Sequence, residues 1–270
     1  MRLSDRLEPY EQVILDLDGC VWVGSEPTPG APAAVEALRA GGRRVAFVTN
    51  DPRRSTEDYV ARLWSVGIRA SLADVVTVGG ATQRLLHEEH SGRTAFVIGT
   101  DAMHRHVAEA GLRVLNGTDL ASRAEVVVVA GPDRLRLEDL RDATLSLRRG
   151  ADLVGTSRDP VYPTDAGLEP GTGALLAAVE YASGARARIV GKPEPELFAT
   201  ALDRLGDGRT LAVGDRLDTD VAASARAGMD AALVLTGGTS RTEAAAADDP
   251  RPLYVADTLA ALVLAKSPYS

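Results

Sequence analysis

Two aspartates stand at the end of a hydrophobic run near the start of the chain. The run VILDLD covers residues 13–18 and carries Asp16 and Asp18 directly before Gly19. Side chains two residues apart on a strand point to the same face, about 6–7 Å from each other along the chain. Both carboxylates could therefore face one site at the end of a strand. A strand that merely ends in an Asp-Gly turn would carry the same residues.

Three other segments place polar residues where they suit the same chemistry. The run RVAFVTN ends in Thr49 and Asn50, the run TLAVGD ends in Asp215 with Asp220 shortly after it, and Lys192 stands in a Gly-Lys-Pro turn. Each feature alone has an ordinary explanation, such as a strand end, a helix N-terminus or a solvated charge. The four together, in this order, favour a shared site.

The reaction that these residues suit is phosphoryl transfer through an aspartyl-phosphate. Carboxylates are the oxygen ligands that Mg²⁺ prefers, so Asp16, Asp18 and Asp215 are predicted to bind the ion. Asp220 is predicted as the next residue outward, contacting the ion through a water. With Mg²⁺ bound, Asp16 is the predicted covalent nucleophile. Asp18 is predicted to protonate the leaving alkoxide and then to deprotonate the attacking water.

The transferred phosphoryl group also needs donors for its oxygens. Thr49 and Lys192 are predicted to stabilise the charge on these oxygens. Gly19 and Asn50 complete the predicted phosphate-binding set.

Short Val, Ile and Leu runs alternate with amphipathic segments along almost the whole chain, and many of these segments end on glycine. Unbroken apolar strands that alternate with helices indicate right-handed βαβ units. We therefore predict an α/β fold with a Rossmann-like, doubly wound parallel sheet, whose ligands bind at the carboxyl ends of the strands. The predicted strands are 13–18, 44–50, 94–99, 125–130, 151–156, 210–215 and 231–236.

The composition limits the classes of partner. The 270 residues are 45% hydrophobic and carry a net charge of -8, which argues against nucleic acid or an anionic membrane as the main partner. No apolar run approaches the roughly 20 residues of a membrane span, and the N-terminal segment has acids where a signal peptide is apolar. The single cysteine, Cys20, excludes an internal disulfide and fits a reducing compartment. We expect a cytoplasmic protein.

The motifs resemble those of a known family. DLDGCVW, VTN, GKP and GDRLDTD are similar, in order, to the four motifs of the haloacid dehalogenase (HAD) superfamily, and the resemblance runs from residue 12 to residue 264. The segment 156–184 and Trp22 resemble the NagD-like branch, which includes 4-nitrophenylphosphatases and glycerol-phosphate phosphatases. The resemblance implies a HAD-type phosphatase for small phosphorylated metabolites (sugar, polyol or aryl phosphates), and it suggests a homodimer formed through a cap domain.

The motif spacing predicts where that cap is inserted. Only 33 positions separate Asp16 from Thr49, whereas 143 positions separate Thr49 from Lys192. An α/β cap domain is therefore predicted at 76–186, between core segments at 1–75 and 187–270. In the family such a cap covers the site and reads the leaving group.

The chain departs from the family pattern in two places. The family often reads TNN where this chain has Asp51 in the third position, followed by Arg53 and Arg54. Its cap often carries TNPD where this chain reads TSRD, which ends in Arg158 and Asp159. The sequence leaves open which of these five residues contact the substrate.

Other functions fit parts of the pattern. A phosphotransferase or mutase of the same superfamily, or a non-catalytic phosphate-binding regulatory module, would share these motifs, whereas receiver domains order theirs differently. The apolar spacing around Trp64 predicts a core side chain. The segment TGGTS at 236–240 is predicted as a loop that borders the site, and EAAAADD at 243–249 as a surface helix and turn.

Overall fold

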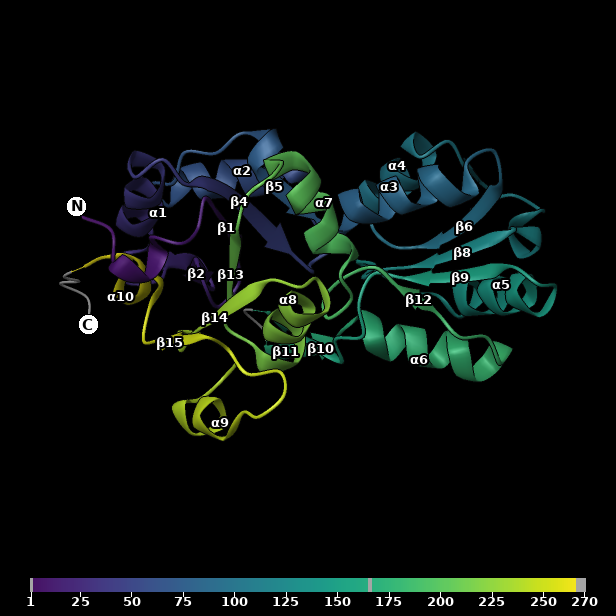
Figure 1. The fold of residues 1–270 in the computed structure, drawn as a ribbon. Coiled ribbons are helices and arrows are strands. Elements are labelled where there is room, and N and C mark those ends of the chain that lie inside the picture. The colour runs from purple at the N-terminus through teal and green to yellow at the C-terminus, as the bar shows by residue number, and fades with distance from the viewer. Residues whose placement is uncertain (1, 165–166, 266–270) are drawn as a thin grey trace. The chain divides into compact units, whose positions relative to one another are not determined.

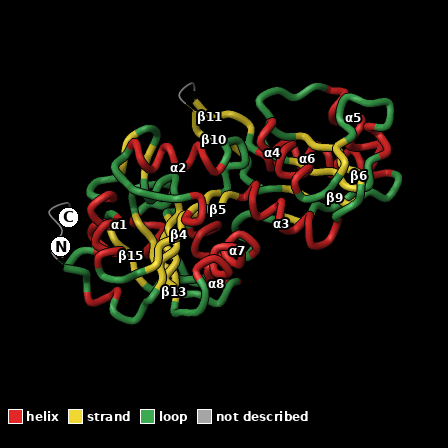
Figure 2. The backbone as a smooth tube through the Cα atoms, turned by 90° about the horizontal axis from the view of Figure 1, so that it is seen from above, coloured by secondary structure: helices red, strands yellow, loops and turns green. Residues whose placement is uncertain are grey.

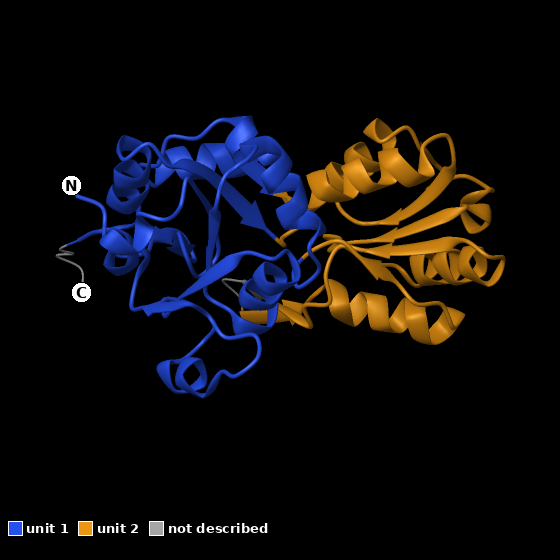
Figure 3. Ribbon diagram, in the orientation of Figure 1, with its two compact units in different colours: residues 1–49, 56–76, 192–270 blue, residues 50–55, 77–191 orange. Residues whose placement is uncertain are grey.

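The computed structural model describes residues 2–164 and 167–265. The chain forms two compact units, shown in two colours in Figure 3. Unit 1 holds residues 1–49, 56–76 and 192–270, and unit 2 holds residues 50–55 and 77–191. The chain thus leaves unit 1 one residue later than the predicted boundary and returns to it five residues later, and the short segment 50–55 groups with unit 2. The outer ends of the predicted core and residues 165–166 of the predicted cap lie outside the described residues.

Unit 1 is built on a six-stranded sheet with the order β15-β14-β13-β1-β4-β5. The strand β1 pairs in parallel with β13 and β4, and β14 pairs in parallel with β13 and β15. The strands are β1 (Gln12–Asp16), β4 (Arg44–Thr49), β5 (Val75–Thr77), β13 (Thr210–Gly214), β14 (Asp230–Val234) and β15 (Tyr254–Ala256).

Helices lie on both faces of this sheet. Figures 1 and 2 show α1 on one side of the strands and α7 and α8 on the other, and α7 packs on β4 while α8 packs on β14. The remaining small elements of this unit include the ribbon β2–β3 and short helical turns. The bounds are α1 (Ala31–Ala40), α2 (Thr56–Ser65), α7 (Glu196–Leu205), α8 (Ala222–Arg226), α9 (Arg241–Ala246), α10 (Leu259–Val263), β2 (Trp22–Val23), β3 (Glu26–Pro27), η1 (Asp5–Leu7), η2 (Leu72–Asp74) and the π-helical turn η4 (Leu217–Val221).

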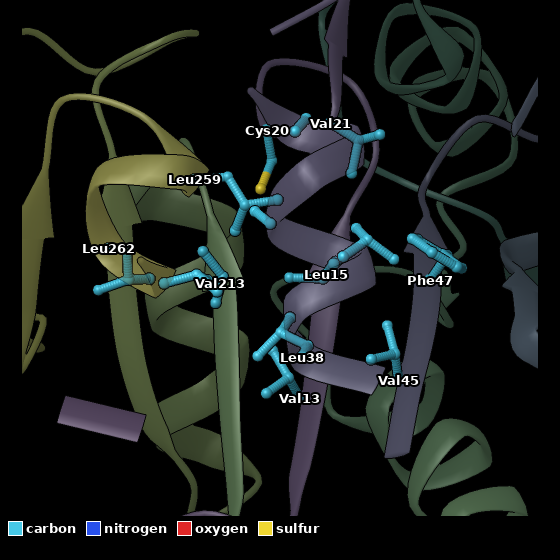
Figure 4. Close-up of a cluster of buried hydrophobic side chains, with 14 of the residues drawn as sticks. Val13, Leu15, Cys20, Val21, Leu38, Val45, Phe47, Val213, Leu259 and Leu262 are labelled. Carbon is cyan, nitrogen blue, oxygen red and sulfur yellow. The ribbon is translucent and has the colours of Figure 1, made fainter. Parts of the chain in front are cut away.

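The core of unit 1 fixes the central strand. Val13 and Leu15 of β1 point into a buried apolar cluster, and Figure 4 shows them together with Leu38 of α1 and Val213 of β13. Because side chains alternate along a strand, Ile14 and Asp16 turn to the opposite face. The burial of large aliphatic side chains, about 1.5–3 kcal/mol each, holds β1 in the register that positions Asp16 at its carboxyl end.

Unit 2 has its own parallel sheet of five strands, in the order β12-β9-β8-β6-β7, and an antiparallel hairpin β10–β11. Within this unit, α3 and α4 pack together and so do α5 and α6, and Figure 1 shows the two pairs on opposite faces of the sheet. The bounds are α3 (Val78–His90), β6 (Thr94–Ile98), α4 (Asp101–Glu109), β7 (Arg113–Val114), η3 (Ala121–Arg123), β8 (Val126–Val129), α5 (Leu137–Arg148), β9 (Asp152–Gly155), β10 (Val161–Thr164), β11 (Gly167–Pro170), α6 (Thr172–Ser183) and β12 (Arg188–Ile189).

The predicted α/β class with doubly wound parallel sheets is confirmed, and each predicted strand is present within two residues of its predicted ends. The segment EAAAADD begins in α9, as expected. The prediction for Trp64 is wrong, because its side chain is 56% exposed and its indole N–H donates to the carbonyl of Ala70 at 2.8 Å. None of the helices in the described part of the chain combines the length and apolar character that a membrane span needs.

Candidate active site

The predicted site residues of unit 1 gather where three neighbouring strands end. Asp16 is the last residue of β1 and pairs in register with Val48, so Thr49 follows one position further along β4. On the other side, Leu15 pairs with Val213, which brings Asp215 to the same edge just after β13. The parallel register therefore collects these polar side chains at the carboxyl ends of the strands.

Three carboxylates form a compact buried group at this edge. Oxygen atoms of Asp16, Asp215 and Asp220 lie within 4.8 Å of one another, and each residue is at most 7% exposed. Asp220 reaches the group from the π-helical turn η4, a rare local geometry that is frequent at functional sites. An all-oxygen set of this kind suits a hard divalent cation such as Mg²⁺. The sequence predicts that Asp220 contacts the ion through a water, whereas in the structure its carboxylate lies within 4.8 Å of those of Asp16 and Asp215.

Lys192 is the cation that faces this group. It is 4% exposed, and its Nζ donates to the carboxylate of Asp16 and, at 2.7 Å, to that of Asp220. Burial by itself would lower the pKa of Lys192, but the charges of Asp16 and Asp220 outweigh burial and raise it. Lys192 thus stays charged at neutral pH. One positive charge against three carboxylates leaves the buried group short of positive charge.

Burial and the shortage of positive charge also raise the pKa values of Asp16 and Asp215. Burial raises the pKa of Asp16 well above its usual range; the charge of Lys192 opposes this rise, and those of Asp220 and Asp215 add to it. Burial and the charge of Asp220 raise the pKa of Asp215 to about 6, even though the backbone amide of Gly238 donates to it. A bound cation would remove this cost, so these residues fit the predicted metal.

The structure does not bring the carboxylate of Asp18 to the other three. Its side chain is 56% exposed, accepts a hydrogen bond from the indole of Trp22 at 2.8 Å, and lies 4.0 Å from the guanidinium of Arg62. The expected shared strand face fails because β1 ends at Asp16. The carbonyl of Leu17 then accepts hydrogen bonds from the backbone N–H groups of three following residues, 20–22, and the chain turns.

Gly19 lies against the metal-ligand group instead of presenting an open amide. Its φ is +85°, and a Cβ at this position would overlap the carboxylate of Asp215. Its N–H donates to the carbonyl of Trp22 at 2.7 Å. A glycine is therefore required here for close packing, and its predicted contact with phosphate stays a prediction.

Thr49 and Asn50 are adjacent in sequence but group with different units. Thr49 ends β4 of unit 1 and is 2% exposed. Asn50 belongs to unit 2, where its Nδ2 donates to Asp159 at 3.4 Å. Their predicted roles toward phosphate stay predictions.

The comparisons with known proteins agree with this arrangement. Residues 13–113 match the family model described as haloacid dehalogenase-like hydrolase, and residues 189–262 match a second model, for HAD-hydrolase-like proteins. The chain is 37% identical over 258 residues to a D-glycerol 3-phosphate phosphatase of Mycobacterium tuberculosis, covering 94% of this chain and 71% of that protein. This chain is a haloacid dehalogenase-like hydrolase.

This HAD-like hydrolase is also similar to a second curated protein and to a solved structure. Human chronophin is 36% identical over 282 residues, covering 96% of this chain and 94% of chronophin. The crystal structure of the glycerol phosphate phosphatase from Mycobacterium tuberculosis in complex with magnesium superposes with a TM-score of 0.89 at 36% identity, covering 97% of this chain and 79% of that one.

The sequence reasoning missed the surroundings of Asp18 in this HAD-like hydrolase. The guanidinium of Arg62 lies 4.1 Å from the ring centre of Trp22, which stacks in turn on Tyr59 at 6.5 Å. Arg62 and Tyr59 come from α2, far from Asp18 in sequence, and no motif marks them. The segment TGGTS was recognised, and it does border the site, since the amide of Gly238 donates to Asp215.

Proposed function

We propose that this HAD-like hydrolase is a Mg²⁺-dependent phosphatase that hydrolyses small phosphomonoesters through a phosphoryl group carried on Asp16. The observation that carries the proposal is the buried group of Asp16, Asp215 and Asp220. Among the described residues, one side-chain cation, the ammonium of Lys192, forms ion pairs with this group. Such a surplus of buried negative charge is costly in a protein without a cation. A divalent cation that binds these carboxylates, together with the phosphate ester that it coordinates, would explain why the protein retains this surplus of negative charge.

The three buried carboxylates would hold the ion. When bound, Mg²⁺ neutralises their charge and that of the phosphate oxygens. The side chain of Asp18 is not assigned to the ion, because it lies with Trp22 and Arg62. This separation leaves Asp18 for proton transfer.

The chain's own residues then divide the two half-reactions. A carboxylate oxygen of Asp16 attacks phosphorus, the ester P–O bond breaks, and Asp18 gives its proton to the leaving alkoxide. Asp18, now ionised, takes a proton from a water, whose oxygen attacks the phosphorus of the aspartyl-phosphate and regenerates Asp16. Thr49 and Lys192 stabilise the charge of the phosphoryl oxygens in both steps.

The relatives' names and the presence of a second unit support the proposed substrate class. Relatives named for glycerol 3-phosphate, for sugars and for p-nitrophenyl phosphate support small sugar, polyol or aryl phosphates as substrates. We propose that unit 2 is the cap that selects the leaving group, while unit 1 performs the phosphoryl chemistry. A homodimer stays a prediction, which gel filtration tests.

The test is phosphate release by the purified chain from p-nitrophenyl phosphate and from a panel of phosphorylated sugars and polyols. We expect turnover with Mg²⁺ and none with EDTA. A matched assay with added glucose separates hydrolysis, which releases free phosphate, from a transferase, which forms a sugar phosphate. Absence of phosphate release from every ester in the panel would overturn the proposal.

A further inference from the structure

The segment 50–55 packs at the carboxyl ends of the strands of unit 2. A Cβ on Gly131, two residues beyond the end of β8, would lie 3.4 Å from Cγ of Arg53. Asn50 donates to Asp159, which follows β9. Ligands of parallel α/β sheets bind at this edge. The residue before the segment is Thr49, the last residue of β4 and a predicted phosphate-binding residue.

Asp51 holds Arg53 in a two-point ion pair. The Nε and a terminal nitrogen of Arg53 donate to the two carboxylate oxygens at 2.8 and 3.0 Å, and the backbone amide of Arg53 donates to the same carboxylate at 3.0 Å. The guanidinium also lies 4.6 Å from the ring centre of Tyr162, which is buried and hydrogen-bonded to Thr172. The guanidinium of Arg53 is thus held in place by the carboxylate of Asp51 along one edge and by the ring of Tyr162 on one face.

The second arginine of this edge is paired in the same way. Arg158, which follows β9, donates from its two terminal nitrogens to the carboxylate of Glu180 at 3.1 and 2.9 Å. Glu180 is 8% exposed and accepts as well from the amide of Ala187. Both guanidinium forks of the cluster are therefore occupied by carboxylates of the same unit.

We infer that Asp51 is a specificity-determining residue that favours a neutral, hydroxyl-bearing leaving group over one that carries a carboxylate. The inference rests on the proposed function. Asp51 lies two residues from Thr49, so their Cα atoms are no more than about 7 Å apart. A substrate carboxylate would meet the charge of Asp51 and compete with it for Arg53. A hydroxyl can donate to a carboxylate and accept from a guanidinium without displacing either.

Arg54 offers the opposite possibility. It is exposed and adjacent to the pair, and a cation at this place could attract an anionic leaving group. The experiment therefore has to separate the effects of Asp51 and Arg53 from that of Arg54.

Two substrates with the same three-carbon backbone provide the measurement. Glycerol 3-phosphate has a hydroxymethyl group where 3-phosphoglycerate has a carboxylate. We expect wild-type kcat/KM to favour glycerol 3-phosphate by at least about tenfold, and Asp51→Asn to shrink this ratio by about tenfold, which corresponds to one charge interaction of 1.4 kcal/mol. The change should lie mainly in the KM for 3-phosphoglycerate.

Controls within the chain make the result specific. Asp152→Asn breaks the Arg93–Asp152 pair (2.6 Å) at the opposite end of the same sheet and should leave the ratio within about twofold of wild type. In the Asp51→Asn background, Arg53→Met should remove part of the gain for 3-phosphoglycerate, whereas Arg54→Ala should retain it. Thermal unfolding of each variant confirms that it is folded.

Three results would overturn the inference. They are a wild type that prefers 3-phosphoglycerate, a ratio that Asp51→Asn leaves unchanged, and a gain that depends on Arg54 alone. In each case hydrolysis of p-nitrophenyl phosphate would still support the proposed function. If the wild type hydrolysed neither these three esters nor any other ester of the panel, both the inference and the proposed function would be overturned.

Discussion

Both units end parallel strands in charged residues, but the two edges balance their charges differently. In unit 1, three carboxylates that are at most 7% exposed face one ammonium, that of Lys192. In unit 2, the pairs Arg53–Asp51 and Arg158–Glu180 match one cation to one anion, and the arginine side chains are 32% and 48% exposed.

This difference separates two kinds of site. A buried surplus of one charge destabilises the fold, so a protein retains it where a ligand compensates it and chemistry uses it. Charges that are matched one to one, with a partly exposed arginine in each pair, cost less and can be displaced or spared by a substrate. We therefore expect changes in unit 1 to abolish turnover and changes in unit 2 to alter which ester is chosen.

The largest expected effect is that of Asp16→Asn. The amide is a poor nucleophile and donates where the acid accepted, so kcat for p-nitrophenyl phosphate with Mg²⁺ should fall by about 10⁴-fold or more. Circular dichroism should show a native fold, because the substitution preserves shape. Turnover near the wild-type value in this variant would exclude Asp16 as the nucleophile.

Asp18→Asn should have the next largest effect, about 10²–10⁴-fold in kcat. Its exposed carboxylate, apart from the buried three, should matter most for the second half-reaction, in which no proton acceptor would remain for water. After an acid quench, intact-mass measurement should show phosphorylated enzyme accumulating with p-nitrophenyl phosphate, whose leaving group needs little protonation. A variant that turns over slowly with no phosphorylated enzyme would contradict this division of roles.

A comparison of Lys192→Met in unit 1 with Arg158→Met in unit 2 tests how much each cation contributes to stability. Removing the ammonium leaves the three buried carboxylates without this counter-charge, which should cost about 3–5 kcal/mol of unfolding free energy. Arg158→Met should cost less, about 1–2 kcal/mol, because Arg158 is half-exposed and the buried Glu180 still accepts a hydrogen bond from the amide of Ala187. Urea unfolding without Mg²⁺ gives both values, and similar losses for the two variants would refute the contrast.

The smallest effect is the response of wild-type stability to Mg²⁺ and pH. Because the pKa of Asp215 in the folded protein, about 6, lies above its unfolded value, its ionisation destabilises the metal-free fold as pH rises from about 4 to about 6. Mg²⁺ at about a hundred times its Kd should raise Tm by about 5–10 °C at pH 7.5. The rise should be smaller at pH 5, where the ion must displace a proton. Thermal scans with EDTA as the control test this, and a larger rise at pH 5 would contradict it.

Much of the fold could be read from the sequence because its strands are long apolar runs. EVVVVA and VILDLD have no helical periodicity, which identifies both as strands, and the aspartates at the end of VILDLD mark its carboxyl end as a polar edge of the sheet. The strands β5 and β15 have three residues each and escaped recognition, since a run that short has no clear pattern. Trp64 was misassigned because apolar spacing does not show whether a helix face is covered by another element.

The sequence by itself determined that three of the predicted polar residues lie at the same edge of unit 1. Parallel strands of similar length bring their carboxyl ends together, so Asp16, Thr49 and Asp215 follow from the order of the apolar runs. Only the tertiary structure decided which of the neighbouring carboxylates join the buried group and which point away from it. The turn after β1 carries Asp18 to Trp22 and Arg62, and the π-helical turn η4 carries Asp220 inward. Both outcomes depend on contacts between distant segments, and no local pattern encodes the direction in which a turn aims a carboxylate.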